Sequence, residues 1–323
     1  SSGSNFIEEQ YGYDGWGNPI TVTKFTSYGI GSSFATQGAQ TTTTCYGGGG
    51  VSGCPDDGLH TYPLWTQDAM NHPATSFTYD LRTGNLLSET DLNGQLTQAD
   101  YDDYGRLVKV ARPGDSLDLP TFSVEYIYQS PAWTSGPYGF ATRVTQRIDT
   151  NTSAVLQKYY NGLGQLLQTR MAGAVVNGTA RDVIVDYAYD SMGRVWKQSM
   201  PRDVATGGDM AAQDFGTVVQ TSYDLLGRPL AVTQPDGTST GYDYSISGST
   251  LVATVTDANT NATLQKTDAF GRLISVLPVQ LAGYPANPGV NYTYDALDRL
   301  KTATYGNALT EITYDLAGRK SSM

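Results

Sequence analysis

Four side chains with zinc-binding chemistry lie close together near the start of the sequence: Cys45, Cys54, His60 and His72. Thiolate sulfur and imidazole nitrogen are the ligands that zinc prefers. Their spacing fits no compact zinc finger or zinc ribbon, and both cysteines lie in a glycine-rich stretch. In an exported chain we expect the two thiols to pair as one small disulfide bond. We therefore assign no metal site and no cofactor.

Catalysis would otherwise have to rest on carboxylates or on a histidine-assisted nucleophile. The adjacent pairs Asp56-Asp57 and Asp102-Asp103 form no dyad, because neighbours in an extended strand point to opposite faces. A nucleophilic triad would need one of the two histidines, and neither lies in a Gly-x-Ser-x-Gly phrase. We predict that the chain is not an enzyme, and we name no catalytic residue.

Composition narrows the classes of partner. The formal net charge of -11 repels phosphate backbones, and the 20 lysines and arginines are scattered singly, so we expect no nucleic acid partner. No apolar run approaches the roughly 20 residues that cross a bilayer, so we expect no transmembrane segment. The 23 tyrosines and 4 tryptophans could stack on a surface glycan, but regularly spaced rings more often form cross-strand ladders.

Several of the aspartates, and several of the tyrosines, belong to a short repeat, Tyr-Asp-x-x-Gly-Arg, which must position them. It occurs in six copies, at 13–18, 79–85 (one residue longer), 101–106, 189–194, 223–228 and 314–319, and in degenerate form at 160–165, 267–272 and 294–299. The predicted structural residues of the repeat turns are Tyr13, Asp14, Gly17, Tyr79, Asp80, Gly84, Tyr101, Asp102, Gly105, Arg106, Tyr160, Asn161, Gly164, Tyr189, Asp190, Gly193, Arg194, Tyr223, Asp224, Gly227, Arg228, Asp268, Gly271, Arg272, Tyr294, Asp295, Arg299, Tyr314, Asp315, Gly318 and Arg319.

The spacing of the phrase is that of a tight turn. Asp at the first turn position accepts a backbone N–H two residues on, and Gly supplies the left-handed conformation that returns the chain. Asn161 can replace Asp as the acceptor, and Asp298 can replace Gly because Asp tolerates a positive φ. A turn of this kind, with a bulge at its left-handed residue, joins two antiparallel strands. The flanking Val-, Leu- and Tyr-rich segments have strand composition.

The recurring phrase resembles the YD repeat of RHS-repeat proteins, and the resemblance covers residues 77–323 with an isolated copy at Tyr13. The family includes bacterial polymorphic-toxin RHS proteins, the B and C components of insecticidal toxin complexes, wall-associated proteins and animal teneurins. The resemblance implies a long β-sheet that coils into a hollow shell. In toxin members the shell encloses a C-terminal effector. The family's self-cleaving C-terminal core segment has no counterpart in this sequence, so no catalytic residue is carried over.

We therefore predict an all-β fold of tandem antiparallel β-hairpin repeats, forming a curved, spiralling sheet that is part of a hollow shell or barrel. Residues 1–73 would hold one YD-like hairpin and an irregular Gly/Thr-rich insertion, and residues 74–323 the repeat sheet, truncated at both ends. Open sheet edges would pair with the rest of the parent chain or with further copies.

The predicted function is that of a structural shell segment of an exported protein, secreted or at the cell surface, which encloses or presents a passenger toxin polypeptide. A cell-surface adhesion or extracellular structural module, self-assembling or glycan-binding, is the alternative.

Overall fold

The computed structural model describes residues 5–6, 8–26, 29–30, 37–48, 50–128, 138–279, 287–315 and 318–323. Every regular element in these ranges is a β-strand, and every strand pairing given for them is antiparallel. The predicted all-β fold of antiparallel hairpins is confirmed. The chain forms two compact units, one of Ser1–Ile127 with Thr142–Leu156 and the other of Tyr128–Ala141 with Gln157–Met323.

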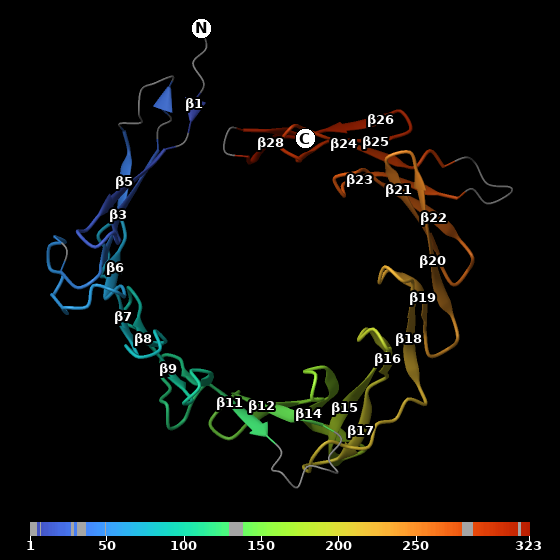
Figure 1. Cartoon of the computed structure of the whole chain (residues 1–323), viewed down its shortest axis with the longest axis horizontal. Coiled ribbons are helices and arrows are strands. Elements are labelled where there is room, and N and C mark those ends of the chain that lie inside the picture. Colours follow the sequence, from blue (N-terminus) through green and yellow to red (C-terminus); the bar gives the residue numbers. More distant parts are fainter. Residues whose placement is uncertain are drawn as a thin grey trace. The chain divides into compact units, whose positions relative to one another are not determined.

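In the first unit the strands pair in the order in which the chain makes them (Figure 1). They are β2 (Glu9–Tyr13), β3 (Pro19–Phe25), β5 (Ala39–Cys45), β6 (Trp65–Gln67), β7 (Thr75–Tyr79), β8 (Leu86–Thr90), β9 (Leu96–Tyr101), β10 (Leu107–Ala111) and β11 (Phe122–Tyr128). The short strands β1 (Asn5–Phe6) and β4 (Gly29–Ile30) pair with each other. Strands β12 (Phe140–Arg147) and β13 (Ser153–Tyr160) contain residues of both units.

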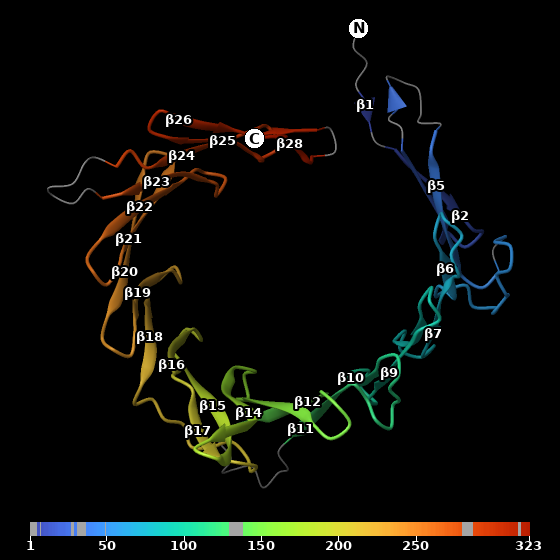
Figure 2. The same ribbon diagram turned by 180° about the vertical axis from the view of Figure 1, so that it is seen from behind.

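The strands of the second unit also pair antiparallel, and Figure 2 shows them from the opposite side. Its strands are β14 (Leu166–Val176), β15 (Thr179–Tyr189), β16 (Val195–Ser199), β17 (Arg202–Ala205), β18 (Val218–Tyr223), β19 (Pro229–Thr233), β20 (Ser239–Ser247), β21 (Thr250–Thr256), β22 (Ala262–Thr267), β23 (Leu273–Pro278), β24 (Val290–Tyr294), β25 (Leu300–Tyr305), β26 (Ala308–Glu311), β27 (Thr313–Tyr314) and β28 (Lys320–Ser322). One fork interrupts the meander, because β15 pairs with β17 through its first half and with β16 through its last residues.

The repeat phrase sets the register of these hairpins. In eight of them the pairing register shifts by one residue where the strand before the turn ends, as the bulged turn requires. The shift lies at Tyr189 between β15 and β16, and at Tyr223 between β18 and β19. The turn therefore fixes which side chains of consecutive strands face each other.

The apolar core of the described residues is thin. Only eight apolar or aromatic side chains are classed as buried there, among them Tyr159 and Ile184, and most strand residues are half-buried. A domain normally buries the apolar face of a sheet against a second layer. With so little buried apolar surface, the strands depend heavily on contacts between neighbouring hairpins.

Candidate functional site

Each repeat turn closes around its aspartate. The Oδ1 atom of Asp190 accepts hydrogen bonds from the backbone N–H groups of Met192 and Arg194, both at 2.9 Å. The Asp190 carbonyl accepts the N–H of Gly193 at 3.0 Å, and the Asp190 N–H donates to the carbonyl of Arg194 at 2.9 Å. The same four bonds form at Asp14, Asp102, Asn161, Asp224, Asp268 and Asp295. The turn thus satisfies nearly all of its own backbone donors.

The arginine that ends the phrase binds the second oxygen of the same carboxylate. Arg194 Nε donates to Asp190 Oδ2 at 2.8 Å, and matching bonds of 2.7 or 2.8 Å form at Asp102, Asp224, Asp268, Asp295 and Asp315. This ion pair within the turn was missed in the sequence analysis. The signal for it is the constant four-residue separation of Asp and Arg.

The tyrosine that opens a phrase reaches back to the preceding hairpin. The hydroxyl of Tyr223 donates to the backbone carbonyl of Val195, the residue after the arginine of the previous phrase, at 2.7 Å. Equivalent bonds of 2.8 to 3.0 Å join Tyr101 to Leu86, Tyr189 to Leu166, Tyr294 to Leu273 and Tyr314 to Leu300. Each tyrosine is therefore a latch between successive hairpins.

The same rings cover the arginines of the preceding phrases. The guanidinium carbon of Arg194 lies 4.6 Å from the centre of the Tyr223 ring, and that of Arg299 lies 4.4 Å from the Tyr314 ring. Cation–π contacts are favourable at this separation. The Arg194 guanidinium also donates to the carbonyl of Asp224 at 2.7 Å. One arginine thus ties together its own turn, the next ring and the next turn.

On two strands without the phrase, a tyrosine ring also covers the arginine of the preceding phrase. Tyr126 on β11 covers Arg106 at 4.0 Å, and Tyr244 on β20 covers Arg228 at 4.2 Å. Neither residue was singled out from the sequence, because no Asp-x-x-Gly turn follows either ring. The available signal was the Tyr-x-Tyr alternation near the end of each strand.

The degenerate phrases keep the turn, and those at 160–165 and 267–272 change the contact with the neighbouring hairpin. Asp298, which stands where the other turns have Gly, adopts a φ of 60°. Tyr160 stacks on Phe140 with ring centres 4.6 Å apart, in a phrase that has Gln165 in place of arginine. At residue 267 threonine replaces tyrosine, so this phrase has no ring to latch onto its neighbour.

Replacing Gly227 by alanine is expected to lower the free energy of unfolding by about 1–2 kcal/mol. Gly227 has a φ of 84°, and a Cβ there would meet no atom within 4 Å, so the cost is one of backbone conformation alone. Urea denaturation measures it. The control is Asp298→Gly, which we expect to be neutral or stabilising; a neutral Gly227→Ala variant would contradict the assigned turn.

The repeat turns should lose stability in acid. Backbone and side-chain hydrogen bonds from Arg194 lower the pKa of Asp190 below its ordinary value of 3.8, and the Arg106 side chain does the same for Asp102. A carboxyl whose pKa is lowered by folding stabilises the fold at pH above its unfolded pKa, and the contribution is lost as pH falls through the folded pKa. We expect an urea midpoint that is level between neutral pH and pH of about 5 and falls below about 4. A midpoint that rises on acidification would refute this.

A buried ionic cluster lies where the sheet forks. Arg170 on β14 and Asp182 on β15 are each only 4% exposed in their side chains and form an ion pair at 2.8 Å. The Arg170 guanidinium also donates to the carbonyls of Ala205, Gly207 and Asp209, and Gly207 N–H donates to Asp182. The cluster therefore holds the segment after β17 against the hairpin of β14 and β15.

A second half of this cluster is built around Asp186. Its carboxylate accepts hydrogen bonds from Gln168 at 2.6 Å, from Arg202 at 2.9 Å and from the backbone N–H of Asp214 at 3.1 Å. Gln168 also exchanges two hydrogen bonds with the backbone of Ala211. The segment 206–217 is thereby pinned at several points, with its polar groups paired by buried side chains.

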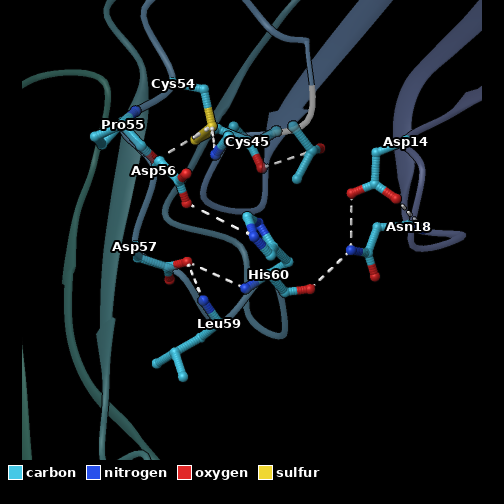
Figure 3. The surroundings of a disulfide bond; sticks show 12 residues. Asp14, Asn18, Cys45, Cys54, Pro55, Asp56, Asp57, Leu59 and His60 are labelled. Atoms are coloured by element: carbon cyan, nitrogen blue, oxygen red, sulfur yellow. Dashed lines mark hydrogen bonds and ion pairs between the residues drawn. A yellow bond between two sulfur atoms is a disulfide. The ribbon is translucent and has the colours of Figure 1, made fainter.

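A disulfide bond joins the two cysteines and closes a short loop in the first unit. Cys45 and Cys54 are bonded, with Cα atoms 5.5 Å apart (Figure 3). Both sulfur atoms are used in this bond, and His72 contacts Asp68 at 2.6 Å, so the four side chains with zinc chemistry do not meet as ligands.

His60 ties this loop to the first repeat turn. Its carbonyl accepts a hydrogen bond from the Asn18 amide at 2.8 Å (Figure 3). Its ring stacks on Trp16 with ring centres 3.6 Å apart. Asp57 accepts the N–H groups of Leu59 and His60. The contacts of the loop are those of a folded insertion packed on the sheet.

Comparison with known proteins gives one family match and a set of similar structures. Residues 138–248 match the model of a domain of unknown function (DUF6443), a segment that includes the buried ionic cluster. No curated protein sequence matches the chain.

Among solved structures, a mutant Photorhabdus luminescens Tc holotoxin pore aligns over 97% of this chain at 16% identity, with a TM-score of 0.47. Crystal structures of TcdB2-TccC3-Cdc42 and TcdB2-TccC3-TEV align over 96% at the same identity and TM-score. This chain spans 18% of the length of each of these chains.

Eight of the repeat phrases open antiparallel hairpins, as the sequence predicts. No helix in the described part of the chain is long and apolar enough to cross a bilayer.

Proposed function

We propose that this chain is a wall segment of an exported RHS/YD-repeat protein, in which the sheet forms part of a shell that encloses or presents a passenger polypeptide. The observation that carries the proposal is the latch between successive hairpins. A tyrosine hydroxyl bond to the preceding hairpin recurs at five phrases, and a tyrosine ring covers the arginine of the preceding phrase at three of these and on two strands that lack the phrase. A wall needs such coupling because it has little core of its own.

The chemistry of the turn aspartates supports a structural role. In Asp102, Asp190 and Asp295, one carboxylate oxygen binds backbone N–H groups and the other binds an arginine. These contacts lower the pKa of each carboxyl. A general acid at neutral pH needs a raised pKa, so these groups are suited to holding turns rather than to transferring protons.

The disulfide supports export to an oxidising compartment. A bond between Cys45 and Cys54 persists outside the cell or in a periplasm and is rare in a reducing cytosol. Secreted and surface-attached forms both satisfy this condition. The passenger, and the choice between a secreted and a surface-attached form, are therefore parts of the proposal.

The test is protease protection of the full-length parent protein, purified as its cell makes it. With the wall intact, we expect the segments of the parent chain that do not belong to the repeat region to resist a protease that digests casein in the same tube. A denaturant concentration that opens the sheet should release them to cleavage at once. Peptides that are cut in the native protein as fast as casein would reject enclosure. Binding of that protein to cells or glycans would then favour the adhesion module.

A further inference from the structure

Hairpins of the second unit present large apolar side chains to solvent at their tips. In the four repeat turns between residues 189 and 299 the exposed residue directly precedes the left-handed position, as Leu163 does in the turn before them, and in the β20–β21 hairpin it is the residue before the strand end. We call these five residues the tip row: Met192, Leu226, Ile246, Phe270 and Leu297. Each is between 72% and 80% exposed. Exposed large apolar side chains that recur at one structural position mark an interaction surface.

The tip row lies along a single edge of the sheet. The strands from β15 to β25 pair in the order β15, β16, β18, β19, β20, β21, β22, β23, β24, β25, all antiparallel. Alternate turns of an antiparallel meander lie at the same edge, so the five tips share an edge. Two strands separate each tip from the next, which gives a spacing of about 10 Å.

Burying the tips in an interface would leave few polar groups without a hydrogen-bond partner. Four of the five backbone N–H groups from Asp190 to Arg194 already donate inside the turn: those of Asp190, Met192, Gly193 and Arg194. The carboxylate beneath each repeat tip is paired with its own arginine. Removing water from such a tip therefore leaves few unsatisfied donors and no unpaired charge.

Two turns at the opposite edge lack an apolar tip. The segments 234–238 and 257–261 read Gln-Pro-Asp-Gly-Thr and Asp-Ala-Asn-Thr-Asn and carry no large apolar side chain. The turn geometry alone does not call for an apolar tip, because the second of these segments makes the same Asp-centred bonds. The apolar residue at the repeat tips is thus a separate feature of the sequence.

We infer that the tip row is a self-association surface, on which the tip row of a second copy of this chain packs. A second copy presents apolar tips at the same spacing of about 10 Å, so two rows can interdigitate over their full length. Five large side chains per copy bury on the order of 1,000 Å² in total, which is near the lower limit of specific interfaces. The net charge of -11 does not oppose this contact locally, since the charges at the repeat tips are paired.

The test is sedimentation velocity of the full chain over a micromolar concentration range. The tip variant is Met192→Ser, Leu226→Ser, Ile246→Ser, Phe270→Ser and Leu297→Ser together. We expect the wild type to form dimers in a concentration-dependent way. The tip variant should have a dimer dissociation constant at least tenfold higher. The matched control is Val175→Ser with Leu309→Ser, two exposed apolar residues of the same unit outside the row, and it should dimerise like the wild type.

A crosslinking measurement keeps the inference testable if the fivefold variant folds poorly. Leu226→Cys should form disulfide-linked dimers under mild oxidation, and Val175→Cys should not. A chain that is monomeric at every concentration overturns the inference, as does equal dimerisation of the wild type and the tip variant. So does a monomer that binds phosphatidylcholine vesicles through the tip row, because the row would then be a lipid-binding surface.

Discussion

Replacing Arg170 by methionine is expected to lower the free energy of unfolding by about 3–5 kcal/mol, because it leaves the buried Asp182 carboxylate without its partner. Both side chains are 4% exposed, and the guanidinium also binds the backbone carbonyls of Ala205 at the end of β17 and of Gly207 and Asp209 after it. The loss should appear as a lower urea midpoint. It should be accompanied by fast proteolytic cleavage within residues 206–217, the segment that the cluster pins.

The chain offers a matched control in Arg181 and Asp203, which form an exposed pair with the same 2.8 Å separation. We expect Arg181→Met to change the unfolding free energy by less than about 1 kcal/mol. The double variant Arg170→Met with Asp182→Leu should recover much of the lost stability, since it removes the unpaired charge. Equal effects of Arg170→Met and Arg181→Met would show that the cluster does not stabilise the fork.

Removal of the disulfide, by Cys45→Ala with Cys54→Ala, should cost about 2–3 kcal/mol, the loop-closure term for a short loop. The two cysteines are nine residues apart in sequence. Because the loop contacts the first repeat turn through His60, β2 and β3 should become less protected from hydrogen exchange, while β18 to β25 should not change.

Reduction of the wild-type chain provides the control for this variant. Dithiothreitol should lower the unfolding temperature of the wild type to that of the double alanine variant and leave the variant unaffected. If the reductant leaves the wild type unchanged as well, the bond does not contribute to the stability of the first unit.

The hairpins were predictable from the sequence because the turn is local. Asp190 and Gly193 build their turn from bonds that span at most four residues, so the phrase carries all the information that the turn needs. The same holds for Asp298, whose positive φ follows from the side chain that can tolerate it. Local chemistry of this kind also placed the ends of the flanking strands.

Contacts between hairpins were not predictable to the same degree. The latch of Tyr223 on Val195 spans 28 residues, and the bond between Arg170 and Asp209 spans 39. Such contacts depend on which strands pair and in which register, and the sequence alone does not give this over long insertions. Tyr126 and Tyr244 were missed for the same reason. Only the pairing of β11 with β10, and of β20 with β19, brings these rings over an arginine.

The latch explains how so thin a core can hold a sheet of this size. Where the phrase is complete, a hairpin contributes its tyrosine to the hairpin before it and its arginine to the hairpin after it, so stability is shared between neighbours as in other repeat proteins. The latch does not depend on the domain boundary that we predict at residue 73 or on the passenger of the proposed shell.

A double-mutant cycle on Arg194 and Tyr223 measures that coupling most directly. We predict that Arg194→Met and Tyr223→Leu, alone and together, give an interaction energy of about 1 kcal/mol in urea denaturation. The same cycle on Arg194 and Tyr244, which lies over a different arginine, should give a value near zero. Strictly additive effects of Arg194→Met and Tyr223→Leu would contradict the account, because the hairpins would then be stable without the contact that joins them.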